Sequence, residues 1–337
     1  MIYIKIGELK FRNVLKNALL INGENYQEHK LFDFSETHTY DPFSMLFTAS
    51  TIRENGKQRF FQITYFPKKD YTKYAGHMGF FKSINPCFKY GKMPGQANGS
   101  KNYIPITKID ILEEFNKHFN IGDAIEKKSK ELAEVLTQDT KLWKVFAFII
   151  REIIRNSVEH SGAECVWICA QYWPCYQLAE IAILDNGKGV KASLKSNRFY
   201  AREICNDRTA LKLSLLPGIT EKFGYKQKDS FWVNSGFGLY MASQLCCKLK
   251  GSFCIVSGDT AFYLQNDKKE YIDTLHKGTA IRMTLRTDIF FDYDKLISET
   301  LKSGTELARK IKYSIKKASE SSGGLNETTI FSINETP

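Results

Sequence analysis

Alternation of apolar and polar positions divides the first part of the chain into strand-like and helix-like stretches. Residues 30–36 and 59–67 have the pattern of strands, whereas 42–55 and 71–84 have the pattern of helices. Pro42 stands where the first residue of a helix tolerates proline. The opening residues, MIYIKI, alternate as an amphipathic strand does. We therefore expect a small α/β unit at the N-terminus.

Residues 85–105 interrupt this pattern, because they are rich in Gly, Pro, Asn and Lys, which indicates a loop or a domain junction. A helical region is expected from about residue 106, and residues 190–235 are polar and irregular. The remaining elements follow from periodicity, with helices expected over 141–160, near 208–216 and over 238–251, and strands over 165–173, 178–184 and 252–286.

The fold class predicted from this order is α/β, arranged as an α+β sandwich. We expect a smaller α/β domain over residues 1–105 and a larger one over 106–290. Residues 291–337 are expected to form a basic helix, centred on LARKIKYSIKK at 307–317, and a mobile tail.

Composition narrows the class of protein. The chain has 337 residues, of which 43% are hydrophobic and 25% charged, as in globular proteins. No apolar run approaches the roughly 18 residues of a membrane helix, and no signal peptide is recognisable, so we expect a cytoplasmic protein without membrane contact. The net charge of +11 is spread along the chain, which does not favour a nucleic-acid partner. Eight cysteines without paired CxxC spacing are expected to be reduced and to bind no metal.

Four short motifs carry the chemical information. Glu152, Asn156 and Glu159 recur at i, i+4 and i+7 on an otherwise amphipathic helix, so they face either water or a ligand that needs oxygens. Asp185 ends a predicted strand and can accept a hydrogen bond from an exocyclic amine such as that of adenine. Two glycines follow Asp185 in the same motif. The remaining two motifs are a second glycine pair before a predicted helix and a Gly-Thr step at 278–279. Taken alone, the motif of Asp185 and its glycines favours an ordinary turn, and the other two glycine motifs carry little information.

In chain order, the four motifs resemble the N, G1, G2 and G3 boxes of the GHKL superfamily, which comprises the gyrase, Hsp-type chaperone, histidine kinase and mismatch-repair ATPases that share the Bergerat fold. The resemblance covers about residues 120–290 and rests on Glu152-xxx-Asn156, Asp185-x-Gly187-x-Gly189, Gly236-x-Gly238-Leu239 and Gly278-Thr279.

The resemblance implies ATP and Mg²⁺ as ligands. Asn156 would be the side-chain ligand of Mg²⁺, and Glu152 would be the general base that orients the attacking water. Asp185 would recognise adenine, with Thr279 completing that end of the site. The glycines and Leu239 of the G1 and G2 boxes would shape the nucleotide pocket and its lid.

Neighbouring residues add weaker expectations. Lys222 in the lid, together with Lys226, is a secondary candidate for contacts with the phosphates. Glu159 is expected either at the rim of the site or on a solvated face. Only about 50 residues follow the G3 box, too few for the transducer domain that supplies a lysine to efficient GHKL hydrolases. Slow hydrolysis is therefore expected.

Three functions are compatible with these residues. The preferred one is a slow ATPase that acts as a nucleotide-dependent switch on a partner protein, with an ATP-dependent homodimer also allowed by the resemblance. The alternatives are a serine/threonine protein kinase of the anti-sigma-factor type and a non-catalytic, nucleotide-gated binding module. A sensor histidine kinase is disfavoured, because His118 lacks the usual acid–basic context of a phosphoacceptor.

The N-terminal residues carry a second resemblance. Residues 31–53 are similar to the central strand-turn-helix of STAS domains, the fold of anti-sigma-factor antagonists. Pro42 and Phe43 occupy the positions of the phosphorylated serine and its neighbour in that family, and Ser44 follows one step later. We therefore expect a STAS-like domain that docks on the ATP-binding domain or on a partner rather than a phosphoacceptor.

Overall fold

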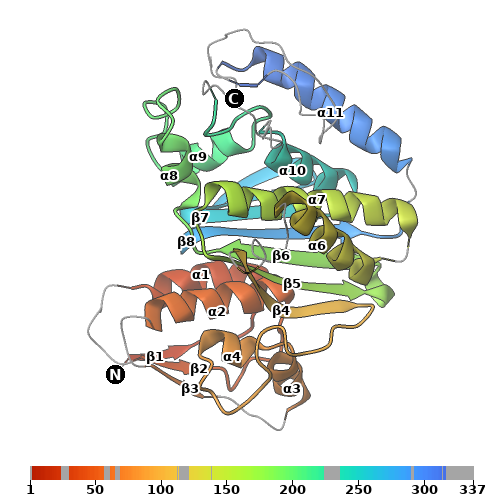
Figure 1. Cartoon of the computed structure of the whole chain (residues 1–337). Coiled ribbons are helices and arrows are strands. Elements are labelled where there is room, and N and C mark those ends of the chain that lie inside the picture. The colour runs from red at the N-terminus through yellow and green to blue at the C-terminus, as the bar shows by residue number, and fades with distance from the viewer. Residues whose placement is uncertain are drawn as a thin grey trace.

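A five-stranded antiparallel sheet forms the centre of the chain in the computed structural model (Figure 1). The structure describes residues 2–23, 30–56, 61–64, 69–111, 113, 121–137, 139–223, 236–289, 292–312 and 314–315. The strand order is β4-β5-β6-β8-β7, with bounds Tyr103–Asp110, Cys165–Trp173, Leu178–Asp185, Lys268–Arg286 and Ser252–Gln265, respectively. The mixed α/β class that the sequence predicts is confirmed at this level.

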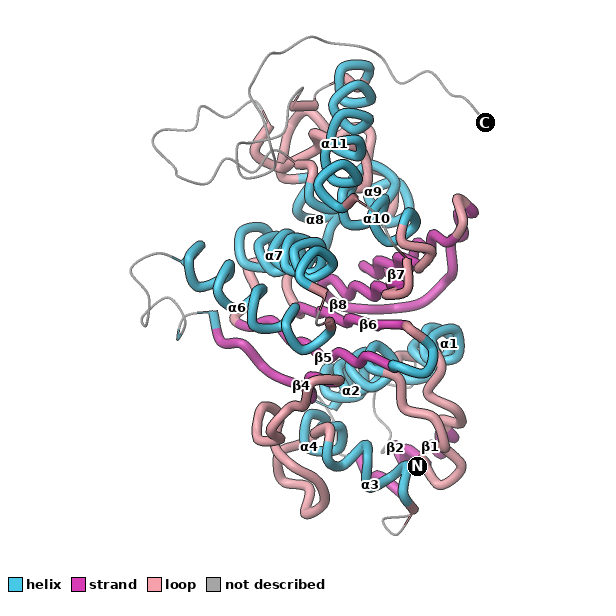
Figure 2. Tube along the Cα trace, turned by 90° about the vertical axis from the view of Figure 1, so that its right-hand side faces the viewer, coloured by secondary structure: helices cyan, strands magenta, loops and turns pink. Residues whose placement is uncertain are grey.

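One face of this sheet is covered by helices α6, α7 and α10, with α11 lying outside them (Figures 1 and 2). Their bounds are Ile121–Leu136, Thr140–His160, Gly238–Lys248 and Tyr293–Lys310. Apolar residues recur along α7 at helical spacing, and Phe146, Ile149, Ile150 and Ile153 are buried against the sheet. The long predicted helix at 141–160 is therefore present and holds its apolar stripe against the strands.

The opposite face of the sheet is covered by the N-terminal part of the chain. Helices α1 and α2 lie between the five-stranded sheet and a three-stranded parallel sheet of order β1-β2-β3 (Figure 1). These elements, together with two short helices, span Ile2–Lys5 (β1), Phe11–Ile21 (α1), Lys30–Asp33 (β2), Pro42–Gly56 (α2), Phe61–Thr64 (β3), Asp70–His77 (α3) and Phe80–Ile84 (α4). Residues 85–102 form the predicted loop, and the expected boundary at residue 105 falls inside β4.

The two faces of β6 show how alternation divides the core. Ile181 and Ile183 pack among the helices of the α7 side, whereas Ala182 and Leu184 pack against α1 and α2. By the same parity, Asp185 at the strand end belongs to the α7 side. Because both faces are covered, β6 reads as a nearly continuous apolar run.

A buried ion pair joins the sheet to α2. Arg282 on β8 donates to Glu180 on β6 at 2.6 Å, and the other carboxylate oxygen of Glu180 accepts the Phe43 backbone N–H at 3.0 Å. Glu180 therefore binds a first-turn amide of α2, where a negative charge is favoured by the helix dipole. Ser44 on the next position is fully buried, so its hydroxyl is not accessible to a kinase in this conformation.

Two sequence predictions need correction. Residues 103–110 form the edge strand β4 and not the start of a helical region, and Pro105 is accommodated at the irregularity between Ile104 and Thr107. In the basic stretch 307–317, α11 ends at Lys310 because the chain is extended at Ile311, and the described residues that follow, 311–312 and 314–315, are not helical. His118, Lys226 and residues 316–337 lie outside the described part of the chain.

The expected lid region contains two helices, α8 (Gly189–Lys195) and α9 (Asp207–Ser214), of which only the second is predicted by the sequence. They share a small apolar cluster with Tyr200, Ile219 and Ile311. Beyond α11, the Ile315 backbone N–H donates to the Gly218 carbonyl at 2.8 Å. Ile311 and Ile315, beyond the end of α11, therefore contact the lid region.

Candidate functional site

Asp185 lies at the floor of a pocket on the α7 side of the sheet, where β6 ends. Only 1% of its surface is exposed. Its carboxylate accepts hydrogen bonds from the Ser157 hydroxyl and the Gly187 backbone N–H, both at 2.9 Å, and from the Thr279 backbone. Burial outweighs these hydrogen bonds and raises the pKa of Asp185 to about 6. A buried carboxylate kept at this cost is typical of a ligand-binding or catalytic group.

The turn after Asp185 lies directly against the end of α7. The Ser161 carbonyl there accepts the Lys188 backbone N–H at 2.8 Å. A Cβ atom on Gly187 would come within 2.3 Å of the same carbonyl oxygen, closer than any side chain allows. Glycine at position 187 therefore lets the turn approach α7 and brings Asp185 within reach of Ser157.

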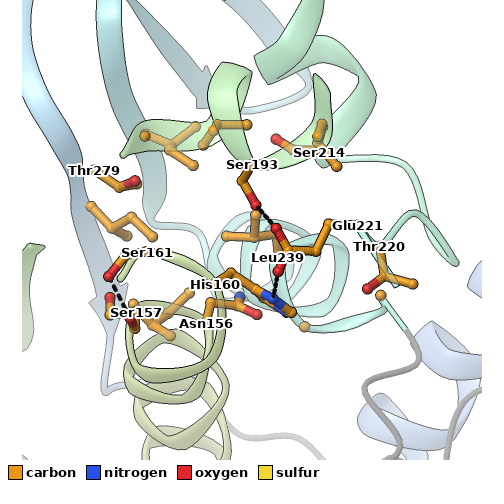
Figure 3. Close-up of a pocket in the computed structure, with 18 of the residues that line it drawn as sticks. Asn156, Ser157, His160, Ser161, Ser193, Ser214, Thr220, Glu221, Leu239 and Thr279 are labelled. Atoms are coloured by element: carbon orange, nitrogen blue, oxygen red, sulfur yellow. Dashed lines mark hydrogen bonds and ion pairs between the residues drawn. The ribbon is translucent and has the colours of Figure 1, made fainter. Parts of the chain in front are cut away.

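Helix α7 forms one wall of the pocket through Asn156, Ser157 and His160 (Figure 3). His160 lies four residues after Asn156 and three after Ser157, so the three side chains share one side of the helix. Glu152, one turn earlier, does not line the pocket. Its Oε1 accepts from the Arg151 guanidinium at 3.0 Å, and the residue is only 5% exposed.

The N-terminus of α10 closes the pocket beside Asn156. A Cβ atom on Gly238 would lie 2.8 Å from Oε2 of Glu152 and 3.6 Å from Nδ2 of Asn156, so glycine permits this contact between helices. Phe237 at the N-cap supplies no side-chain hydrogen bond to the first turn of α10. The partial positive charge of this helix end therefore faces the pocket lined by Gly238 and Leu239.

The pocket holds about 720 Å³ of empty space, part of it open to solvent. Its walls are mainly apolar with a few polar groups among them, which is the usual lining of a small-molecule site. All predicted site residues except Glu152 and Gly187 line it, namely Asn156, Asp185, Gly189, Gly236, Gly238, Leu239 and Thr279. The structure thus brings together four segments that are far apart in the chain.

A polar cluster in the same pocket is not predicted by the sequence. The carboxylate of Glu221 accepts from His160 Nδ1 at 2.9 Å and from the Ser193 hydroxyl (Figure 3). It also accepts from Lys188 Nζ at 3.0 Å. Burial opposes ionisation of Glu221, but these donors outweigh it and lower its pKa to about 2. The cluster ties the turn at 220–222 to α7 and α8. His160 had a usable signal, its i+4 spacing from Asn156, whereas Ser157, Ser193 and Glu221 belong to no motif.

Two of the secondary candidates, Lys222 and Glu159, lie outside the pocket wall. Lys222 lies 3.5 Å from the carboxylate of Glu159, which also accepts from Arg155 at 2.5 Å. Glu159 is therefore part of an ion-pair group at the rim, and its side chain is 14% exposed. Lys222 in this conformation neutralises an α7 carboxylate and does not line the space available to a ligand.

The described residues contain no metal centre built from protein side chains alone, since no three His, Cys, Asp or Glu side chains are grouped to hold an ion. All eight cysteines are free thiols. Within the same residues, no helix has the length and apolar character required to span a bilayer.

Comparison with known proteins identifies no relative: no family model, no curated protein and no solved structure matches this chain.

Proposed function

We propose that this chain binds Mg-ATP in the pocket around Asp185 as a GHKL-type protein and acts as a nucleotide-dependent switch with slow hydrolysis. The observation that carries the proposal is the convergence of the four predicted motifs on one pocket. Convergence of residues separated by more than a hundred positions is not expected of unrelated turns. The architecture supports the same proposal, because a Bergerat-type domain needs a sheet with helices on one face and the nucleotide between helix and sheet.

Adenine is the ligand part that fits the floor of the pocket. A carboxylate offers about four acceptor positions, and three are used by protein donors on Asp185. One acceptor position is left for an exocyclic amine. Ile153, Ile255 and Ile281 line the pocket nearby and provide apolar surface for a flat ring.

The phosphates are assigned to the end of the pocket formed by Asn156 and α10. Backbone amides at the start of a helix bind anions well, and Phe237, the N-cap residue of α10, makes no side-chain hydrogen bond to them. The Asn156 amide oxygen is the side-chain atom available to Mg²⁺, which would take its other ligands from phosphate and water. Mg²⁺ supplies neutralisation of the phosphate charge when it is bound.

Glu152 is assigned as the base that positions the attacking water. In this conformation its carboxylate is held by Arg151 and lies behind Gly238. Reaching a water in the pocket requires movement of α10 or of the lid. Turnover is therefore expected to be slow and to be limited by a conformational step.

The N-terminal unit is proposed to be STAS-like and to act as a docking domain. Its parallel strands β1, β2 and β3, with α2 following β2, support this proposal. The burial of Ser44 favours docking over phosphorylation.

The test follows the fate of γ-labelled ATP with purified protein and Mg²⁺. We expect slow release of labelled phosphate, abolished by Glu152→Ala while ATP binding is retained. Glu134→Ala, an exposed position on α6, is the matched control and should hydrolyse at the wild-type rate. Equal turnover in Glu152→Ala and wild type would remove the general-base assignment. Label transferred to a protein in a cell lysate would favour the kinase alternative, and absence of ATP binding would overturn the proposal.

A further inference from the structure

Helix α2 of the N-terminal unit contacts the turn at Asp185 from the side of the sheet opposite the pocket. Asn186 accepts a hydrogen bond from the Ser50 hydroxyl at 3.1 Å and donates one to the Glu54 carboxylate at 2.5 Å. Ser50 and Glu54 are four residues apart on α2, so they present one face to the turn. Both contacts cross from the first 56 residues of the chain to the pocket region.

A second contact reaches the same turn through His276. The His276 ring is buried and donates to the main-chain carbonyl of Asp185. Its ring centroid lies 5.2 Å from that of Phe47 on α2. Burial lowers the pKa of His276 to about 4, so the imidazole is neutral near pH 7. Helix α2 thus supports the Asp185 backbone by packing as well as by hydrogen bonding.

Asp185 and Asn186 are adjacent but serve opposite faces of the sheet. Asp185 lines the pocket on the α7 side, whereas the Asn186 side chain reaches α2 on the other side. Because the two residues share a peptide unit, a shift of the Asp185 backbone changes the position of Asn186 against Ser50 and Glu54. Ligand binding and α2 docking are therefore mechanically connected.

We propose that Asn186 is a positioning residue through which a nucleotide at Asp185 and the docked state of α2 favour each other, so that the N-terminal unit is the switch's partner within the chain. The inference rests on the proposed function, because it takes the ligand of Asp185 to be ATP. Linkage makes the coupling reciprocal: if ATP tightens α2, then a tight α2 raises ATP affinity by the same factor.

Substitutions at this contact test the proposal by ATP affinity. Asn186→Ala removes both bonds to α2 and leaves the pocket walls intact, and we expect it to weaken ATP binding about fivefold or more. Asn186→Asp should weaken binding further, because it places two carboxylates together. Adding Glu54→Gln to Asn186→Asp should restore affinity, since the new amide can donate to the new carboxylate. Thr51→Ala is the control, because that hydroxyl bonds only within α2 to the Phe47 carbonyl.

Hydrogen exchange distinguishes coupling from a general loss of stability. In the wild type, Mg-ATP should slow amide exchange in α2. At saturating ATP, this slowing should be lost in Asn186→Ala. The Asn186→Asp, Glu54→Gln double variant should regain it. If the wild type binds ATP but α2 exchange does not change, the inference fails and the proposed function stands. If the wild type does not bind ATP, the proposed function fails and the inference with it. Should Asn186→Ala not fold, Ser50→Ala provides the same comparison with one bond removed.

Discussion

Replacing Asp185 by asparagine separates the stability of the fold from its ligand-binding capacity. The carboxyl has an ordinary pKa of 3.8, which burial raises to about 6 in the folded protein. The shift of roughly 2 pH units corresponds to about 3 kcal/mol, because one unit is worth about 1.4 kcal/mol. Ionisation of Asp185 at pH 7 therefore lowers the free energy of unfolding by about this amount.

The sign of the pH dependence follows from the direction of the shift. Protonation of Asp185 favours the folded state, so its stabilising contribution is complete below about pH 4 and is lost as the pH rises through about 6. Asparagine cannot ionise and keeps the neutral state at every pH. It also loses one acceptor atom, which costs about 1 kcal/mol. We therefore expect Asp185→Asn to gain about 1–3 kcal/mol of unfolding free energy at pH 7, and no more than a small difference at pH 4.

The assay is urea unfolding of both proteins at pH 7 and pH 4, together with ATP binding by calorimetry at pH 7. The expected result is a more stable protein that no longer binds ATP, because an amide presents an N–H where the amine of adenine needs an acceptor. Asp273→Asn, at an exposed position on β8, controls for loss of a surface charge. Wild-type ATP affinity in Asp185→Asn would refute the recognition assignment. A variant destabilised equally at both pH values would refute the account of the pKa.

Three further predictions concern the pocket and its support. Gly187→Ala should lower the free energy of unfolding by about 1–3 kcal/mol and weaken ATP binding, because its Cβ would lie 2.3 Å from a carbonyl oxygen. The control is Gly23→Ala, whose Cβ would lie no closer than 3.4 Å to a neighbouring atom, and it should leave thermal unfolding unchanged. Glu221→Gln should loosen the 220–222 turn, and we expect faster tryptic cleavage there in the absence of nucleotide; an unchanged cleavage rate would contradict the role of the anionic cluster. Glu180→Gln leaves its arginine partner buried without a full counter-charge and should cost about 3–5 kcal/mol. Glu270→Gln, which breaks an exposed arginine pair, should cost less than about 1 kcal/mol in the same urea titration.

The sequence predicts best those elements that carry a long apolar pattern. The helix at 141–160 and the strands at 165–173 and 178–184 match α7, β5 and β6 closely. Helix α7 has one apolar stripe, and the two strands, which are covered on both faces, read as nearly continuous apolar runs. The sequence does not predict the strand β4, because Pro105 and the polar residues of an edge strand weaken the alternation. Helix α8 is only seven residues long, too short for a period to be recognised.

The candidate site likewise contains residues that the sequence predicts and residues that it does not. Asp185, Asn156 and the glycines are recognisable because each has a local constraint, a strand end, a helical spacing or a close approach, that limits the residue type. Glu221 had no such signal, since its donors come from α7, from the turn after β6 and from α8. Its role depends on how these segments meet in space, and no local pattern encodes that meeting.

The covering of the central sheet on both faces bears on how this chain can be divided. Trp167, Ala182, Leu184 and Val256 lie on the face that α1 and α2 bury. A fragment that begins at the 85–102 loop would expose this apolar face to water, and exposed patches of this kind promote association. We therefore expect the five-stranded sheet to remain monodisperse in solution only together with its N-terminal cover, and substitutions on one side of this interface to require matching changes on the other.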